Sequence, residues 1–484
     1  MGDVGAGDGS RTRLMPRVPR VIVIPTRWIG LGAAFVLVAA AMAVPPLLDW
    51  NVHINTFPPL YADWDPRLGP GSVPAFAIAL LGTLYAANLA MVLSWRRLLL
   101  LVWLVGACWM LALATVDGGA GISTILNTYN EYLRTARGTT DLPTVLRVYV
   151  DHIPFTATAD WPPEIARNLV EHGALDSLDP RTNWPAHLAG HPPGALTFFV
   201  VLVRLGLGSG LAAGLVVTLI AATTAVAVLV TVRTLGAEQL ARRAAPFLVL
   251  GPAAIWQSVS ADAVFAAVAA WGLATLAIAA TRTRTVTMLA WSVLSGLLLG
   301  YTMMLSYGLP LLGLLALTVL YLAGSWRPLV PVAVAAAAVV LAYAGLGFAW
   351  WEGIHVLRGR YWDGVAHKRP GSYWTWANLA ALLCSAGPLM AAGVAEAGGR
   401  LTRGVRVIAQ PERVVVLLAV AAAAAVAAAD LSQMSRAEVE RIWLPFVPWL
   451  LLGCALLPKR WRRRGLALQV VAALLLQHLL RTAW

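Results

Sequence analysis

Long apolar runs alternate with short polar ones along most of the chain. Thirteen runs of 15 to 24 residues contain almost no charge, and turn residues or charged residues separate them. Because a helix of roughly 20 apolar residues spans a bilayer, the pattern predicts an all-α polytopic membrane protein with about 13 transmembrane helices. We place these helices at 28–48, 73–94, 98–116, 209–232, 244–259, 262–280, 286–303, 308–323, 328–351, 374–395, 413–429, 443–457 and 465–480.

Composition supports this class. Of the 484 residues, 59% are hydrophobic and 12% are charged. A soluble domain cannot bury so large an apolar share, which excludes a cytosolic enzyme. The three cysteines, Cys108, Cys384 and Cys454, all fall within apolar runs and form no Cys-X-X-Cys pair. Neither a disulfide framework nor a zinc finger is therefore predicted.

The positive charge follows the topology of the predicted helices. The formal net charge is +13, and all but two of the basic residues are arginines. Short cytoplasmic loops of membrane proteins are enriched in Arg and Lys. If the apolar segment 194–207 is a helix lying along the outer interface, 22 basic residues fall inside and 13 outside, with Arg204 unassigned. This predicts a multi-pass protein of the inner (plasma) membrane with a cytoplasmic N-terminus and an extracytoplasmic C-terminus, and nucleic acid is not an expected partner.

The same topology divides the chain into four parts. We expect a disordered cytoplasmic tail at 1–27, N-terminal transmembrane helices at 28–97, a membrane module at 98–351 with an outer loop at 117–193, and C-terminal transmembrane helices at 352–484 with outer loops at 352–373 and 430–442. Within the largest loop, the pattern predicts short helices at 122–136 and 143–153. Since 18 of the 23 acidic residues fall on the outer side, we expect the chemistry there.

Two carboxylates of the largest outer loop are candidate general bases. Asp117 follows the third predicted helix at its outer end, and Glu131 lies in the run Tyr129-Asn130-Glu131-Tyr132. A carboxylate at a membrane boundary can take the proton of an acceptor hydroxyl if burial raises its pKa. The alternatives are a solvated helix end for Asp117 and the solvated face of an amphipathic helix for Glu131.

Asp262 and His191 are candidate substrate-binding residues. Asp262 opens an apolar helix on the outer side, where it can cap free backbone N–H groups. Because a carboxylate near membrane depth is costly, contact with a metal ion or a sugar is the rival interpretation. His191 belongs to the motif His191-Pro192-Pro193. His187 precedes it by four residues, but the stretch is Pro-rich and helical spacing is not expected, which disfavours a zinc site.

Further candidates for substrate binding lie in the last two outer loops. Arg360 and Arg369 belong to a loop with four cations on the side where positive charge is disfavoured. A guanidinium offers paired donors that suit phosphate, either in a lipid headgroup or in a specific ligand. Glu440 and Arg441 directly precede an apolar helix, as an interfacial anchor or as an ion-paired rim around a ligand.

The order of these motifs resembles the GT-C superfamily of integral membrane glycosyltransferases. A membrane helix, a large outer loop with carboxylates, a His-Pro-Pro motif and a later helix that opens with Asp are similar to its protein-mannosyltransferase and aminoarabinose-transferase branch, and to actinobacterial integral membrane proteins. The resemblance runs from about residue 98 to residue 323. Asn130-Glu131-Tyr132 stands where many relatives have an Asp-Glu-Tyr-like run, so Asn replaces the first Asp.

This resemblance implies that 98–351 is a catalytic membrane module. It would transfer a sugar from a polyprenyl-phosphate carrier to a cell-envelope glycan or protein outside the cytoplasm. No cofactor is required, although a divalent cation held by Asp262 or His191 is compatible with the resemblance. The alternatives from other classes are a transporter of a lipid-linked or anionic solute and a non-catalytic membrane scaffold.

The resemblance also suggests roles for the candidate residues. The base would be Asp117 or Glu131, and the altered motif leaves that choice open. Two extra helices precede the module, so under an alternative alignment Asp49 or Asp63 would take the role. The base would take the acceptor proton while the acceptor attacks the anomeric carbon in a single displacement. The carrier phosphate would then leave toward Arg360, Arg369 or Arg441.

Overall fold

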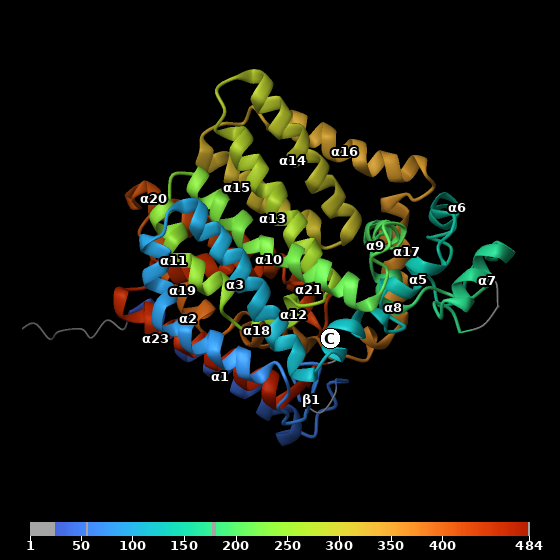
Figure 1. Ribbon diagram of the computed structural model, residues 1–484, viewed down its shortest axis with the longest axis horizontal. Coiled ribbons are helices and arrows are strands. Elements are labelled where there is room, and N and C mark those ends of the chain that lie inside the picture. The colour runs from blue at the N-terminus through green and yellow to red at the C-terminus, as the bar shows by residue number, and fades with distance from the viewer. Residues whose placement is uncertain (1–24, 55–56, 177–180, 483–484) are drawn as a thin grey trace, which may run out of the picture.

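The computed structural model describes residues 25–54, 57–176 and 181–482, and most of them lie in helices (Figure 1). The all-α class predicted from the sequence is confirmed. The predicted tail at 1–27 falls outside the described residues except for its last three, and helix α1 (Thr26–Leu47) begins within those three. The described strands are β1 (Ala62–Trp64) and β2 (Leu480–Thr482), which pair antiparallel with Ala62 opposite Thr482.

Seven helices in the described part of the chain are long and apolar enough to cross a membrane. A further two pairs of helices each qualify if the pair is counted as one bent span. The polytopic membrane class is therefore confirmed, with seven to nine candidate spans. The seven are α1, α2 (Ser72–Val92), α3 (Trp95–Ala114, continued by the turn η1, Thr115–Asp117), α10 (Gly210–Thr234), α13 (Ala261–Ala280), α14 (Thr285–Leu305) and α20 (Gln410–Leu431).

The two bent pairs turn at glycines. Helices α16 (Leu329–Gly345) and α17 (Trp350–Asp363) meet at 72°, and α18 (Gly371–Ala386) and α19 (Leu389–Leu401) meet at 110°. Gly347 and Gly387, at the two bends, have φ angles of 108° and 88°. Only glycine adopts such angles without strain, so these two positions end the first helix of each pair.

The number of full-length spans is lower than the 13 predicted. The remaining four predicted spans are divided into shorter elements or begin with several charges. Hydropathy did not predict the divisions because apolar composition alone does not reveal a break at Gly or Pro. They correspond to α11 (Glu238–Val249) with α12 (Ala253–Gln257), to η3 (Leu309–Leu312) with α15 (Gly313–Ala323), to α22 (Val447–Leu451) with η6 (Leu452–Leu456), and to α23 (Lys459–Leu479), which starts with five basic residues among its first six.

In the segment between α3 and α10, the helices of the described residues are all short. The predicted helix at 122–136 is wrong as one element, because it is broken by an extended stretch before α5. The order is α4 (Ala120–Ser123), η2 (Ile125–Asn127), α5 (Tyr132–Gly138), α6 (Leu142–Arg147), α7 (Pro163–Glu171), α8 (Ala186–Gly190) and α9 (Gly194–Arg204). In Figure 1, α5 to α7 project at the right of the helical body.

The segments assigned to the outer side by charge lie together on one face, which we call the loop face. The backbone N–H of Tyr61 donates to Glu440, and Arg67 pairs with Asp117. The β1–β2 pair brings the C-terminal end of the described chain to the same face. The three-residue turn η4 (Val365–His367) and the short helix α21 (Val439–Ile442) also belong to it. Which side of a membrane this face occupies stays a prediction.

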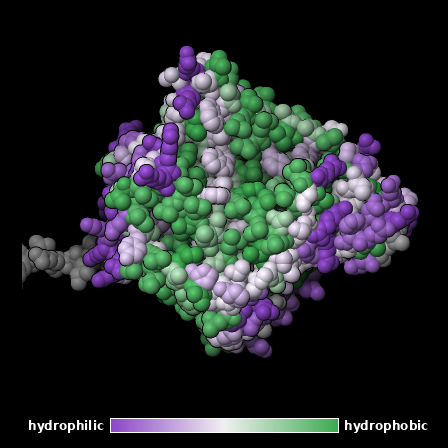
Figure 2. Space-filling model, in the orientation of Figure 1, coloured by the Kyte–Doolittle hydropathy of each residue, from purple (hydrophilic) through white to green (hydrophobic). Residues whose placement is uncertain are grey.

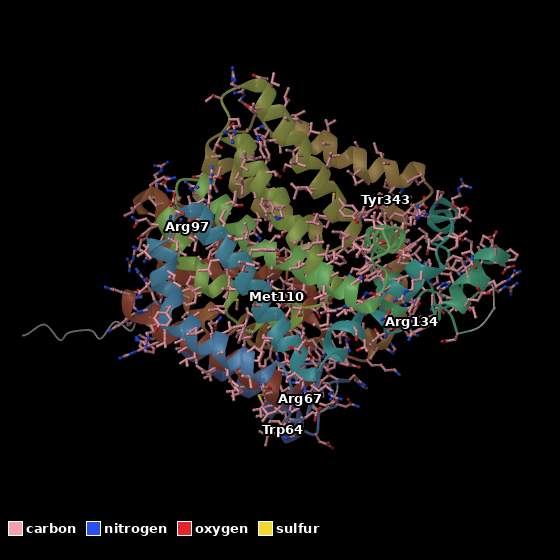
Figure 3. The ribbon with its side chains drawn as sticks, in the orientation of Figure 1. Trp64, Arg67, Arg97, Met110, Arg134 and Tyr343 are labelled. Carbon is pink, nitrogen blue, oxygen red and sulfur yellow. The ribbon has the colours of Figure 1, made fainter. Side chains whose placement is uncertain are left out.

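The opposite face carries the arginine-rich helix ends, and we call it the basic face. It comprises residues 25–27, 93–97, 233–243, 281–284, 325–327, 396–413 (with the turn η5, Val405–Val407) and 458–464. Contacts hold these ends together, including Arg27 with Glu396 and Arg242 with the Leu93 carbonyl. Hydrophobic surface fills the middle of Figure 2, between hydrophilic patches at its edges. In Figure 3, α3 runs from Arg97 past Met110 toward Arg67.

Small residues let helices approach closely in the core. Gly393 of α19 and Gly453 of η6 pack backbone to backbone, and a Cβ added to Gly393 would lie 2.6 Å from the Cys454 nitrogen. Close backbone approach through small residues is a common way for helices to associate in membranes. Gly398 lies five residues further along the same helix, and a Cβ added there would meet no atom of the described residues within 4 Å.

We expect Gly393→Leu to destabilise the protein and Gly398→Leu to leave its stability nearly unchanged. The larger side chain at 393 would force α19 and η6 apart, and overpacking of this kind costs about 1–3 kcal/mol or more. Thermal unfolding of the two purified variants in detergent tests this. Equal melting temperatures for both variants would contradict the packing described above.

Candidate functional site

A cavity of about 960 Å³ opens on the loop face and is the candidate site. Its walls come from the segment before α5, α8, the α12–α13 junction, the start of η3, α17, and the region from the end of α20 to the residues before α22. One part of the wall is apolar, with Leu309, Leu357 and Phe446 among its residues. Other wall residues are charged or polar, including Glu131, His187, His191 and Arg441.

Arg441 lies at the centre of an ion cluster that is shielded from bulk water and forms part of the cavity wall. Its Nη1 atom is 3.2 Å from Asp262 Oδ2 and 3.4 Å from Glu131 Oε1. Its Nη2 atom is 3.0 Å from His187 Nε2. Side-chain exposure is 4% for Arg441, 4% for Asp262 and 8% for Glu131. These charges are therefore shielded from bulk water. The attraction between them is stronger in this buried position than it would be in water.

His187 connects two members of the cluster. Its Nδ1 lies 2.8 Å from Glu131 Oε1, while its Nε2 faces the Arg441 guanidinium. Since a guanidinium can only donate, Nε2 must accept, and Nδ1–H donates to the carboxylate. The two neighbours thus select the neutral Nδ1–H tautomer of His187. This residue was missed as a site candidate at the sequence level.

A single helical turn places both histidines. Helix α8 lies in the Pro-rich stretch, and His191 Nδ1 is 2.8 Å from the His187 carbonyl. The expectation that helical spacing does not apply here is therefore wrong, because Pro185 precedes the turn and Pro192 follows it without interrupting it. His191 Nε2 lies 3.9 Å from Asp262 Oδ1, so the i, i+4 pair spans the cluster from Glu131 to Asp262.

A break in the chain turns Glu131 inward. Residues 128–131 separate η2 from α5, and Glu131 has extended backbone angles of −93° and 164° as the residue before α5. Its exposed fraction is 6%, so the alternative of a solvated amphipathic face is excluded. One carboxylate oxygen, Oε2, is buried with no hydrogen-bond partner among the described residues. That oxygen keeps an unused acceptor position next to the cavity.

The electrostatic surroundings set the charge states of the cluster. Burial raises the pKa of Glu131, but His187 and Arg441 lower it by more, so the net shift is downward. The raised pKa that the sequence predicted for a general base is therefore not found at Glu131, and the carboxylate is ionised instead. Burial lowers the pKa of Arg441, yet Asp262 and Glu131 raise it by more. Burial also lowers the pKa of His191, with Asp262 opposing this effect. At neutral pH, Glu131 is therefore ionised, Arg441 is protonated and His191 is neutral.

Asp262 belongs to the first turn of α13 and is 3% exposed. Its contacts with Arg441 and His191 tie this helix to α21 and α8. Helix capping alone therefore does not account for it. The apolar stretch around Asp262 would leave its carboxylate without solvation, and the Arg441 guanidinium supplies the compensating charge.

Asp117, the other candidate base, lies outside this cavity. Arg67 binds both of its carboxylate oxygens, and Gln477 donates to one of them at 3.3 Å. These contacts join η1 to the segment after β1 and to the end of α23. The structure thus separates the two candidates and brings only Glu131 to the cavity wall.

Arg360 and Arg369 bind backbone carbonyl groups instead of lining the cavity. Arg360 donates to the carbonyls of Ile153 and Trp184, at 2.6 and 2.9 Å. Arg369 donates to His53 and Arg436 carbonyls and pairs with Glu438. Both arginines brace the loop face, and Arg441 is the candidate arginine that lies at the cavity.

Glu440 holds the segment before β1 against α21. Its Oε1 accepts the Tyr61 backbone N–H at 3.1 Å, and the residue is 1% exposed. Burial raises the pKa of Glu440 to about 7. Unlike its neighbour Arg441, this side chain does not line the cavity and acts as a brace.

A metal ion has no ready-made site in the described ranges. Within them, no group of three or more His, Cys, Asp or Glu side chains is arranged to hold an ion. The Arg441 guanidinium occupies the space between Glu131 and Asp262, where a cation bound by these carboxylates would lie. The divalent cation considered from the sequence therefore stays a prediction.

Comparisons with protein-family models, with curated protein sequences and with solved structures give no match for this chain. The family resemblance drawn from its motifs accordingly stays a prediction, and the site is interpreted from its own geometry.

The raised pKa of Glu440 predicts that stability falls as the pH rises from about 4.5 to about 7. Over this interval the folded protein holds a proton that the unfolded chain has lost, so unfolding becomes more favourable. We expect Glu440→Gln, which keeps the oxygen that accepts from Tyr61, to flatten this decline. Melting temperatures at pH 5 and pH 8 test it, with exposed Glu164→Gln as the control. A decline of equal size in both variants would contradict the assignment.

Proposed function

We propose that this protein is a glycosyltransferase that moves a sugar from a polyprenyl-phosphate carrier to an extracytoplasmic acceptor of the cell envelope. The observation that carries the proposal is the buried Glu131 carboxylate at the cavity wall, ionised at neutral pH and with Oε2 free of protein partners among the described residues. An inner-membrane location with the loop face outside belongs to the same proposal.

Glu131 would act as the general base. An acceptor hydroxyl in the cavity donates its hydrogen bond to Oε2, and its oxygen attacks the anomeric carbon of the donor sugar. The new C–O bond forms as the bond between that carbon and the phosphate oxygen breaks. The hydroxyl proton passes to Glu131, and the electron pair leaves with the polyprenyl phosphate. Proton transfer to a positioned carboxylate is a standard contribution to such displacements.

Arg441 would couple the base to the leaving group. Before the reaction, its charge is shared between Glu131 and Asp262. Once Glu131 takes the proton, its negative charge disappears, and the guanidinium is free to attract the charge that develops on the phosphate oxygens. A fixed donor directed at developing charge is a major source of catalysis.

The apolar wall supports a lipid-linked donor. Leu309 and Leu311 precede α15, while Ala428 and Phe446 contribute from α20 and the turn before α22. These residues adjoin helices that expose apolar side chains on the outside of the molecule, such as Leu314. A cavity that combines apolar wall residues with buried charged groups suits a phosphate carried on a polyprenyl chain.

Glu131→Gln should reduce sugar transfer by about 10²- to 10⁴-fold, the usual contribution of a general base. Asp117→Asn should retain transfer because Asp117 lies outside the cavity, paired with Arg67. The assay is transfer of radiolabelled sugar from polyprenyl-phosphate donors to a cell-envelope fraction by the purified protein in lipid vesicles.

Donor binding and thermal unfolding of the same variants separate loss of the base from loss of the fold. Transfer lost in Asp117→Asn but kept in Glu131→Gln would reverse the assignment of the base. Absence of both transfer and donor binding by the wild type across a broad donor panel would contradict the proposed function and favour a transporter or a scaffold.

A further inference from the structure

The basic face has far more positive charge than its own acidic residues can neutralise. Its described segments contain 18 basic and 3 acidic residues. All three acids are already engaged: Glu238 pairs with Arg233 and Arg242, Glu396 with Arg27 and Arg400, and Glu412 with Arg400. The other fourteen cations have no ion pair within the described chain. Any further neutralising group must come from outside the described residues of this face.

Within this face, one arginine from each of two neighbouring helices is of particular interest. Helices α11 and α23 contact one another, and the charge of Arg243 in α11 contributes, after burial, to lowering the pKa of Arg462 in α23. Both are half-buried, and the Nε atom of each is buried without a hydrogen-bond partner among the described residues. Buried N–H donors are nearly always paired, so two such guanidinium groups near each other indicate a missing acceptor.

The helix that carries Arg462 adds to the positive potential. Helix α23 has 21 residues, and five of its first six are basic, with no acidic residue in the first turn. The start of a helix already carries partial positive charge from its free N–H groups, which favours anions and disfavours cations. This arrangement is costly in isolation and is relieved by a bound anion.

Apolar and aromatic groups border the same place. Trp461, next to Arg462, packs against Trp28 of α1 with ring centroids 4.5 Å apart. Trp28 is 48% exposed, while Trp461 is 7% exposed. Trp at helix ends is typical of the level of lipid headgroups. The aromatic pair beside Arg462 therefore fits the level of lipid headgroups.

We propose that Arg243 and Arg462 form a binding site for a phosphate anion, with the headgroup of an anionic phospholipid as its source. The phosphate oxygens accept hydrogen bonds from both guanidinium groups and bridge α11 to α23. Basic pockets between membrane helices on the cytoplasmic side bind anionic lipids in this way. The site lies on the face opposite the Glu131 cavity and is independent of the proposed glycosyltransferase activity.

The test compares melting temperatures of the purified full-length protein in detergent. Phosphatidylglycerol should raise the melting temperature of the wild type by several degrees more than phosphatidylcholine does, and most of that gain should be lost in Arg243→Gln and in Arg462→Gln. Arg464→Gln is the matched control, because it removes one charge from an exposed position of the same helix. It should keep the gain.

A charge reversal sharpens the test. Arg462→Glu would pair directly with Arg243, so it should melt at a higher temperature than the wild type in the absence of lipid and should gain nothing from phosphatidylglycerol. A matching gain with inorganic phosphate, lost in the same variants, would keep the anion site and make soluble phosphate its source. No gain with either compound, or a gain equally reduced in Arg243→Gln and Arg464→Gln, would overturn the proposal.

Discussion

The buried guanidinium of Arg441 is the constraint on which the loop face depends. It lies between the carboxylates of Glu131 and Asp262, which come from the residue before a short helix and from the start of a long apolar helix. Removing ions from water costs several kcal/mol each, and only close partners offset that cost. Removing one member would leave another charge buried and alone, at a cost of about 3–5 kcal/mol. The fold must therefore bring three distant segments together at one point, and the cavity forms beside it.

Composition and periodicity were enough to predict the class of the fold. They were not enough to predict where its apolar segments break into separate helices. The apolar runs predicted membrane helices, and seven to nine candidate spans confirm the polytopic class. Surplus predictions arose where the chain stays apolar through a break, as at Gly251-Pro252 between α11 and α12. Hydropathy averages over such positions, whereas the break depends on backbone angles and on neighbouring helices. The tertiary contacts that select one break over another are not visible in a single sequence.

Most residues of the candidate site were named from the sequence, but their assembly was not predicted. Asp262 was identifiable because a charge in apolar surroundings is expensive, whereas Glu131 and Arg441 were selected from polar outer segments. The mutual contacts of these three residues were not predictable, because they are separated by more than a hundred residues in each case. His187 was overlooked because the prolines around it concealed the single turn of α8, although its i, i+4 relation to His191 was the available signal. Asp117 is the opposite case, a residue that the sequence suggested as a base and that has a structural role instead. Its carboxylate pairs with Arg67.

The loop face and the basic face differ in how their cations are neutralised. This difference affects what each face can bind. Among the described residues of the loop face, carboxylates outnumber cations, and the buried arginines there are already held by carboxylates or carbonyl groups. An anion reaches Arg441 only by competing with Glu131 and Asp262, so strong attraction must wait until one carboxylate is protonated. On the basic face, cations such as Arg243 have no such competitors among the described residues, and an anion can bind without any change of protonation. An affinity for phosphate that appears only after proton transfer suits a phosphate that takes part in a reaction. An affinity for phosphate that needs no proton transfer suits a phosphate that stabilises the structure.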